Sequence, residues 1–321
     1  MKNSVVNNNL ENIYKDIKVL IQNTRKKVYI QVNTEMLNLY WNIGKIIMNI
    51  QNGQKRASYG KEILKVLATK LTEEFGNGFS KRNLERMRMF YKLFPIATTL
   101  SSQLTWSHYV ELIKIKEEEE RNYYLNECIS CNWSVRELQR QIKTCTYDRL
   151  ITKNYKTDKL ATESNEFIKN PYILEFLNLE KDKFSEKDLE KKILEYLKEF
   201  LLELGNGYMF VGNQKRIAIE NNNYYPDLVF YNNIIKSYLI IDLKIGKLTH
   251  KDLGQMQMYV NYYDKEIKND DENNTIGLLL CKDKNKTVIK YTLNGNENIY
   301  ASKYMLHLPS KEELIKIVED V

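Results

Sequence analysis

Two apolar runs separated by a polar turn constrain this chain more than any other stretch. The first begins at Asp227, and the second, Tyr238 to Lys244, reads YLIIDLK and encloses Asp242 among apolar residues. Short apolar runs joined by an Asn-Asn pair are typical of two β-strands linked by a turn. Charged side chains within an apolar strand need partners once they are buried. The sequence therefore predicts paired strands that carry a polar cluster.

The spacing of these charges indicates a metal site. Asp242 and Lys244 are two residues apart, so in a strand both side chains point to the same face. Strand pairing brings Asp227 within reach of Asp242, and two carboxylates with the carbonyl of Leu243 suffice for Mg²⁺ or Mn²⁺, which prefer oxygen ligands. Such an ion polarises a phosphate and activates a water. Lys244 would orient or deprotonate that water, or stabilise charge on the phosphoryl oxygens.

This pattern leaves two interpretations open. One is a metal-dependent phosphodiesterase built on Asp227, Asp242 and Lys244. The other is an exposed salt bridge on a strand, preceded by a Pro-Asp step at a turn. The apolar neighbours of Asp242 favour the first interpretation, because buried charge clusters concentrate at functional sites.

The chain has 321 residues, enough for two domains, and 43% of them are hydrophobic. Lys and Arg total 49 against 42 Asp and Glu, and this net charge of +7 permits a polyanionic partner without requiring one. The stretch 151–171 is polar and has no clean periodicity. It is predicted to be a linker between domains at 10–150 and 172–321.

Apolar residues at helical spacing predict that the N-terminal domain is mostly α-helical. Ser80 is placed to cap a helix that Pro95 ends. The basic side chains of this helix lie largely outside its apolar stripe and are Lys81, Arg82, Arg86 and Arg88. A short helix, a turn and a basic helix fit a helix-turn-helix that reaches a DNA groove, and they also fit an ordinary solvated helix face.

The C-terminal domain alternates helix and strand signals. Ser185 with Asp188, and Thr249 with Asp252, have the spacing of helix capping boxes. These boxes predict one helix that ends at Gly205 and another that runs to about residue 263. The predicted strands are 208–211, 216–220, 228–231, 238–244, 275–281 and 287–293, and a last helix follows Ser310. The order predicts an α/β domain with a central mixed sheet.

The cysteines and the N-terminus bear on the cellular compartment. Cys128 and Cys131 have the spacing of a zinc or redox pair, but without a second pair they are interpreted as helix residues in a reducing cytoplasm. The N-terminal sequence lacks the apolar core of a signal peptide. No run is long and apolar enough to span a membrane. We therefore expect a cytoplasmic protein without a membrane partner.

The same residues also resemble a known family. A Pro-Asp pair followed fifteen residues later by Asp-x-Lys resembles the PD-(D/E)XK nuclease superfamily, and Gln255 to Tyr259 resembles the Q-x-x-x-Y motif of its RecB-like branch. The blocks FLLELGNGYMFVGNQ, YYPDLVFYNN and LIIDLKIGK are similar to those of YhcG-like nucleases. LYWNIGKII and GFSKRNLERMRMFY resemble the helical N-terminal domain of that family, whose function is unknown. The resemblance covers about 32–263.

The resemblance implies a restriction-endonuclease-like fold for the C-terminal domain and a role for each motif residue. Asp227 and Asp242 would hold the metal, and Lys244 would be the catalytic lysine. Glu190 would match the glutamate of the first helix, which helps to hold the metal or positions the site.

The remaining motif positions carry weaker implications. Gln255 and Tyr259, on one helix face, would contact the DNA backbone or the site. The family usually has Glu where Asp242 stands, and the shorter side chain would shift the metal. Gln214 also matches a family position, for which the sequence offers no mechanism.

The sequence and the resemblance together favour a divalent-metal-dependent DNA endonuclease, with a role in DNA repair, recombination or anti-phage defence. Its expected partners are DNA, a second copy of the chain, or other defence or repair proteins. The alternatives are a DNA-binding or complex-forming protein without catalysis, and a helix-turn-helix regulator. The choice between DNA and RNA stays open.

Overall fold

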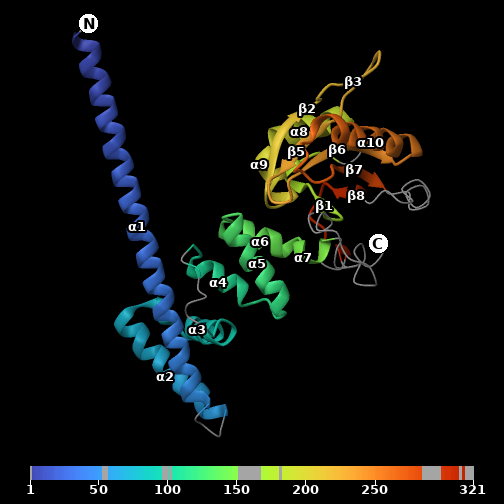
Figure 1. The fold of residues 1–321 in the computed structure, drawn as a ribbon. Helices are drawn as coiled ribbons and strands as arrows, with labels where there is room; N and C mark the ends of the chain where they lie inside the picture. Colours follow the sequence, from blue (N-terminus) through green and yellow to red (C-terminus); the bar gives the residue numbers. More distant parts are fainter. Residues whose placement is uncertain are drawn as a thin grey trace. The chain divides into compact units, whose positions relative to one another are not determined.

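The computed structural model describes residues 2–52, 57–95, 101, 103–150, 168–180, 183–283, 298–310 and 313–314. The chain forms two compact units, Met1–Gln139 and Arg140–Val321 (Figure 1). Among the described helices, none is both long and apolar enough to cross a membrane.

The first unit is helical, as its apolar periodicity predicts. Its elements are α1 (Lys2–Asn52), α2 (Ala57–Phe75), the 3-10 helix η1 (Asn77–Phe79), α3 (Lys81–Leu93), α4 (Trp106–Leu112), α5 (Glu118–Ser130) and the start of α6 (Val135–Lys143). The second half of α1 packs on α3, where Ile47, Leu84 and Met87 are buried. A Cβ on Gly44 of α1 would lie 2.1 Å from the carbonyl oxygen of Met87, so only glycine permits this close crossing.

One local prediction in this unit is wrong in its mechanism. Ser80 does occupy the N-cap position of α3, but its hydroxyl makes no capping hydrogen bond. Instead, the Asn83 side-chain amide donates to the carbonyl oxygen of Gly78, at 3.0 Å, and this bond holds the turn before the helix. The helix-turn-helix function of α2 and α3 stays a prediction.

The second unit is built on a six-stranded mixed sheet with the order β1-β8-β7-β6-β5-β2. The strands are β1 (Tyr172–Ile173), β2 (Tyr208–Asn213), β5 (Leu228–Asn232), β6 (Ser237–Lys247), β7 (Ile276–Asp283) and β8 (Ile299–Met305), with a separate hairpin of β3 (Ile217–Ile219) and β4 (Asn222–Tyr224). The remaining elements are α7 (Thr146–Arg149), the 3-10 helix η5 (Glu175–Leu177), α8 (Glu186–Glu195), α9 (Leu197–Leu204), α10 (His250–Tyr262) and the π-helix η6 (Tyr263–Ile267).

Helices cover both faces of this sheet (Figure 1). In the antiparallel pair β5–β6, Leu228 lies opposite Ile241, and both enter the apolar core under α8 and α9. Their neighbours Val229 and Ile240 enter the core under α10. Strand alternation thus sends successive residues into two cores. The predicted α/β fold with a central mixed sheet is confirmed.

Both predicted capping boxes of this unit are present. Ser185 accepts from the Asp188 backbone N–H and donates to its carboxylate, and Thr249 does the same with Asp252. The helix predicted from Ser185 to Gly205 is interrupted, because Tyr196 has a non-helical backbone between α8 and α9.

Other strand and helix predictions differ in outcome. The predicted strand 287–293 lies outside the described residues. Strand β8 was not predicted, because the polar Ser302 interrupts the apolar pattern of its sequence IYASKYM. This serine is buried, and its hydroxyl donates to the Lys169 carbonyl oxygen at 2.7 Å. Ser310 and Glu313 form the reciprocal bonds of a cap. The rest of the predicted last helix, after residue 314, lies outside the described residues.

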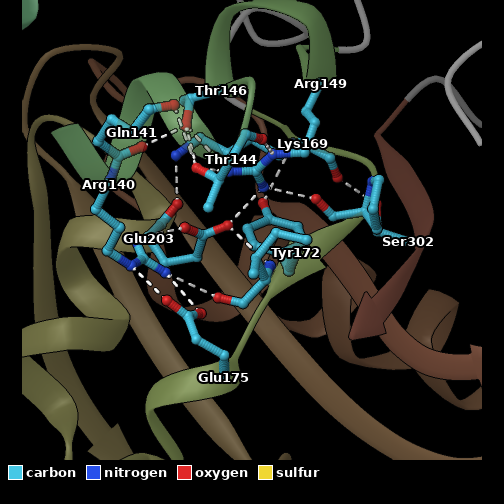
Figure 2. Close-up of polar contacts among 12 residues, drawn as sticks. Arg140, Gln141, Thr144, Thr146, Arg149, Lys169, Tyr172, Glu175, Glu203 and Ser302 are labelled. Atoms are coloured by element: carbon cyan, nitrogen blue, oxygen red, sulfur yellow. Dashed lines mark hydrogen bonds and ion pairs between the residues drawn. The ribbon is translucent and has the colours of Figure 1, made fainter. Parts of the chain in front are cut away.

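The segment 140–149 packs within the second unit rather than apart from it. Arg140 and Arg149 both bond the buried carboxylate of Glu203 (Figure 2). Of the predicted linker, 151–167 lies outside the described residues, whereas Lys169 and Asn170 are buried in the second unit. The domain limits 10–150 and 172–321 stay a prediction.

Candidate active site

The strand pair β5–β6 brings Asp227, Asp242 and Lys244 together. The Lys244 Nζ lies 2.8 Å from Asp242 Oδ2, and the side chain of Asp242 is almost fully buried. The Leu243 backbone N–H donates to Asp227 Oδ2, at 2.7 Å. The cluster expected from the spacing therefore forms, although the role of each residue in it stays a prediction.

The last part of β6 has no strand partner on its β5 side, and carboxylates bond its backbone N–H groups there. The β5 ladder with β6 starts where Leu228 faces Ile241, so β6 continues past the end of its neighbour. Beyond that point the Leu243 N–H bonds Asp227, and the Ile245 N–H bonds Glu186 Oε1 at 3.2 Å. Since the N–H and C=O of one strand residue point to the same side, the Leu243 carbonyl lies on this same edge. The edge thus presents a carbonyl oxygen beside Asp227.

The protonation of Asp227 is strongly perturbed. Burial raises its pKa, the charge of Asp242 raises it further, and the bond from Leu243 and the charge of Lys244 lower it, with a net value of about 7. In the absence of a cation, the site therefore disfavours ionisation of Asp227 while Asp242 is negatively charged. A cation bound between the two carboxylates would relieve this repulsion.

The donor set fits a hard divalent cation. The carboxylates of Asp227 and Asp242 and the Leu243 carbonyl are all oxygen ligands, and Mg²⁺ usually takes only one or two carboxylates and keeps several waters. In the described part of the chain, no three His, Cys, Asp or Glu side chains converge to hold an ion by themselves. Oxygen ligands of this kind are those that a hard cation prefers.

Lys244 keeps its proton in this environment. Burial alone lowers its pKa, but the Asp242 carboxylate, and then those of Glu186 and Asp227, raise it above the ordinary value. Glu186 Oε2 lies 3.9 Å from Lys244 Nζ. A retained ammonium favours charge stabilisation over proton abstraction among the roles predicted for Lys244.

Gln214 links the helix glutamate to the strand aspartate. Its Nε2 donates to Glu190 Oε2 at 3.0 Å and to Asp227 Oδ1 at 3.1 Å. Glu190 is half-buried and also accepts from Asn213 Nδ2, at 3.2 Å. Gln214 has a positive φ of 47°, which turns its side chain back toward the carboxylates at the end of β2. The sequence offered no mechanism for Gln214, and these contacts supply one.

Glu186 was missed by the sequence analysis. It stands four residues before Glu190 on α8, so both carboxylates lie on one helix face. That spacing could have identified it once Glu190 was selected.

Gln255 and Tyr259 lie on the inner side of α10. Tyr259 is 1% exposed, and the Gln255 side-chain amide donates to its hydroxyl. Burial raises the pKa of Tyr259, and the nearby charges of Asp242 and Asp227 raise it further. Of the two predicted roles, this geometry favours contact with the site over contact with the DNA backbone.

The predicted DNA-binding basic residues all lie on α3 of the first unit. Lys81 and Arg82 are exposed, and Arg86 is half-buried with its guanidinium bonded to Asn83 Oδ1 at 3.1 Å. Arg88 is also half-buried. Contact of these side chains with DNA stays a prediction.

The raised pKa of Asp227 has a consequence for stability. We expect Asp227→Asn to raise the melting temperature of the metal-free protein at pH 8 and to change it little near pH 4. The carboxyl has an ordinary pKa of 3.8 and a pKa of about 7 in the fold, so the stability from its protonated form is full below about pH 3.8 and is lost progressively as the pH rises from there to about 7. Asn imitates the protonated form at every pH. Thermal melts in EDTA measure the effect, and a variant that melts below wild type at pH 8 contradicts it.

Comparison with known proteins identifies the family of both halves of the chain. Residues 16–149 match the DUF1016 N-terminal domain, and residues 165–319 match the YhcG PDDEXK nuclease domain. The Escherichia coli (strain K12) protein named "Putative nuclease YhcG" is 35% identical over 346 residues, which cover 95% of this chain and 92% of that protein.

Two solved structures give weaker matches. A repair endonuclease from Pyrococcus abyssi aligns with 39% of this chain at 18% identity and a TM-score of 0.27. An EndoMS–dsDNA2 complex aligns with 41% at 14% identity and a TM-score of 0.28. The matched part spans about half of each of those chains, 49% and 50%, and TM-scores this low decide nothing about function.

Proposed function

The chain belongs to the YhcG PDDEXK nuclease family, and from that premise we propose that it is a divalent-metal-dependent endonuclease that hydrolyses phosphodiester bonds in DNA. The observation that carries the proposal is the pair of carboxylates, Asp227 and Asp242, with the Lys244 ammonium 2.8 Å from Asp242. Opposite charges this close in a partly buried site suit a reaction in which negative charge grows on a phosphate.

Each residue of the site has a defined task in this proposal. Asp227, Asp242 and the Leu243 carbonyl would hold Mg²⁺ or Mn²⁺, which would polarise the scissile phosphate and lower the pKa of a water. Lys244, protonated at neutral pH, donates to a phosphoryl oxygen and stabilises its developing charge. Asp227 must be ionised, so it releases its proton when the cation binds.

The surrounding residues position these groups. Glu190 and Gln214 fix the side chain of Asp227 through the amide bonds described above. Gln255 and Tyr259 close the α10 side of the cluster. A role in DNA repair, recombination or anti-phage defence fits this chemistry, and so does a cytoplasmic location; both remain hypotheses.

Cleavage assays test the proposal. Supercoiled plasmid, linear duplex DNA and RNA of matched sequence are incubated with the protein and Mg²⁺, Mn²⁺ or EDTA. We expect nicking or linearisation of the DNA with either metal and none in EDTA. DNA binding without cleavage under any metal would instead support the non-catalytic alternative. Cleavage restricted to RNA would overturn the substrate assignment.

The regulator alternative needs a variant of the full-length chain. A fragment that ends at Arg149 would separate this side chain from Glu203, its buried partner. Replacing the exposed Lys81 and Arg82 of α3 with Glu avoids that problem. If this double variant no longer binds DNA, and if the wild-type protein does not cleave DNA with any metal, the results support the helix-turn-helix regulator over the nuclease.

Gln214→Ala should lower the cleavage rate by roughly tenfold to a hundredfold, as expected for a group that orients a metal ligand. The variant removes the amide that bridges Glu190 and Asp227. A rise in the Mn²⁺ dissociation constant should accompany the slower cleavage, and the melting temperature should change little. The control is Gln257→Ala, whose amide bonds only Asn261 among the contacts described. Unchanged metal affinity in Gln214→Ala would exclude the positioning role.

A further inference from the structure

The first half of α1 carries an apolar surface that its own unit leaves uncovered. Residues 11–32 are exposed on every side of the helix. Figure 1 shows this part of α1 running beyond the other helices of the first unit. Ten large apolar side chains are exposed here. Val19, Tyr29 and Ile30 lie on other sides of the helix. The other seven are between 46% and 67% exposed and are Ile13, Tyr14, Ile17, Leu20, Ile21, Val28 and Val32.

These seven side chains form one stripe. At 3.6 residues per turn, positions 13, 14, 17, 20, 21, 28 and 32 fall on one side of the helix, with Thr24 and Gln31 among them. Charged residues flank the stripe, with Asp16 and Lys27 on one edge and Lys18 and Arg25 on the other. An apolar seam bordered by charges is the pattern of a helix that packs against another helix.

The exposed stripe is large enough for a stable interface. From their exposed fractions, these seven residues present roughly 700 Å² of surface, somewhat less than the ~800 Å² that each partner contributes to a standard protein–protein interface. From Ile13 to Val32 the stripe extends over 20 residues, or about 30 Å of helix. An isolated helical segment of this kind gains little stability from propensity alone and depends on a partner for its apolar face.

The partner must offer a helix of similar length whose apolar face is still uncovered. Among the described elements, the next longest helix is α2 with 19 residues, and its apolar side chains Leu64 and Ala68 are already buried against α1 and α3. A second α1 offers an equally long helix with an equally uncovered stripe. A contact between identical stripes is also self-complementary and closes as a two-fold dimer.

We propose that the chain forms a homodimer in which the α1 stripes of two copies pack together as a two-stranded helical pair. This interface is independent of the nuclease chemistry, so a protein without activity can still show it. It also brings two copies of the Asp227–Asp242 site into one particle.

The oligomeric state of the full-length protein tests the proposal. Light scattering after gel filtration, repeated over a range of concentrations, should give a dimer for wild type. The double variant Ile17→Glu/Leu20→Glu should be a monomer under the same conditions. Both side chains are exposed in the single chain, so the variant should keep its far-ultraviolet circular dichroism and its DNA cleavage per site.

Two further variants make the result specific. Gln22→Glu lies on the opposite side of α1 and should leave the dimer intact. Leu20→Ala, which trims one side chain, should weaken dimerisation by roughly tenfold. Wild-type protein that stays monomeric at every concentration overturns the proposal. That result is expected if another part of the chain, or a different protein, covers the stripe. A dimer that survives the double variant overturns it as well.

Discussion

Asp242→Asn should lower the rate of DNA cleavage by about 10³-fold or more, because removing one member of a catalytic unit disables the others. Asn keeps the shape of the side chain and removes its charge. The variant therefore loses a metal ligand and leaves the Lys244 ammonium, 2.8 Å away, without its closest counter-charge. Initial rates of plasmid nicking with Mn²⁺ measure the effect.

Two other variants serve as a control and as a conservative replacement for this prediction. Asp271→Asn changes an exposed aspartate that pairs with Lys236 at 3.1 Å, and it should cleave like wild type. Asp242→Glu restores the residue usual in the family, and it should retain activity within roughly tenfold, since a carboxylate still reaches the metal. If Asp242→Asn folds, as judged by its melting curve, and cleaves as fast as wild type, the assigned site is wrong.

Glu203→Ala should destabilise the second unit by about 3–5 kcal/mol, the usual cost of breaking a buried ion pair. Glu203 is fully buried on α9 and receives Arg149 at 2.6 Å and Arg140 at 3.1 Å (Figure 2). It also accepts the backbone N–H of Ile173, at 2.9 Å. The substitution leaves the buried guanidinium of Arg149 without its carboxylate.

The pH dependence of this loss follows from the pKa of Glu203. Burial raises that pKa, but the charges of Arg149, Lys169 and Arg140 lower it more, to about 2 from an ordinary value of 4.5. A depressed pKa contributes stability above about pH 4.5 that disappears as the pH falls toward 2. The difference between wild type and variant should therefore be full at pH 7 and shrink in acid.

Urea denaturation at pH 7 and pH 3 measures this difference. Glu195→Ala is the control. It removes an exposed carboxylate on the neighbouring helix α8 that pairs with Lys192, and it should have little effect on stability. A Glu203→Ala protein as stable as wild type at pH 7 would show that the network contributes nothing. A loss that is equal at both pH values would exclude the ionised carboxylate as its source.

Local sequence rules predicted those parts of the site that lie on adjacent elements. Asp227, Asp242 and Lys244 could be placed together because strand alternation and a short turn fix their positions. The caps at Ser185 and Thr249 could be read directly from residue spacing. Each of these inferences spans few residues, and the structure agrees with them on geometry.

Contacts between distant residues could not be predicted in this way. Glu203 stands in an apolar helical run, and its partners Arg149 and Arg140 lie 54 and 63 residues earlier in the chain. The bridge from Gln214 to Glu190 depends on one positive φ value and on the packing of α8. Strand β8 contains the buried Ser302, whose hydroxyl is satisfied by a hydrogen bond to the Lys169 carbonyl oxygen, 133 residues earlier in the chain. Periodicity carries no information about such partners.

Calorimetric titration of Mn²⁺ into the purified protein tests the central claim most directly, because it requires no knowledge of the natural substrate. Wild type should bind Mn²⁺ at the site formed by Asp227 and Asp242, with proton release near pH 7, and Asp242→Asn should lose that binding while Asp271→Asn keeps it. Absence of binding to wild type, or equal binding by wild type and Asp242→Asn, would contradict the assignment of a metal-dependent nuclease site to these carboxylates.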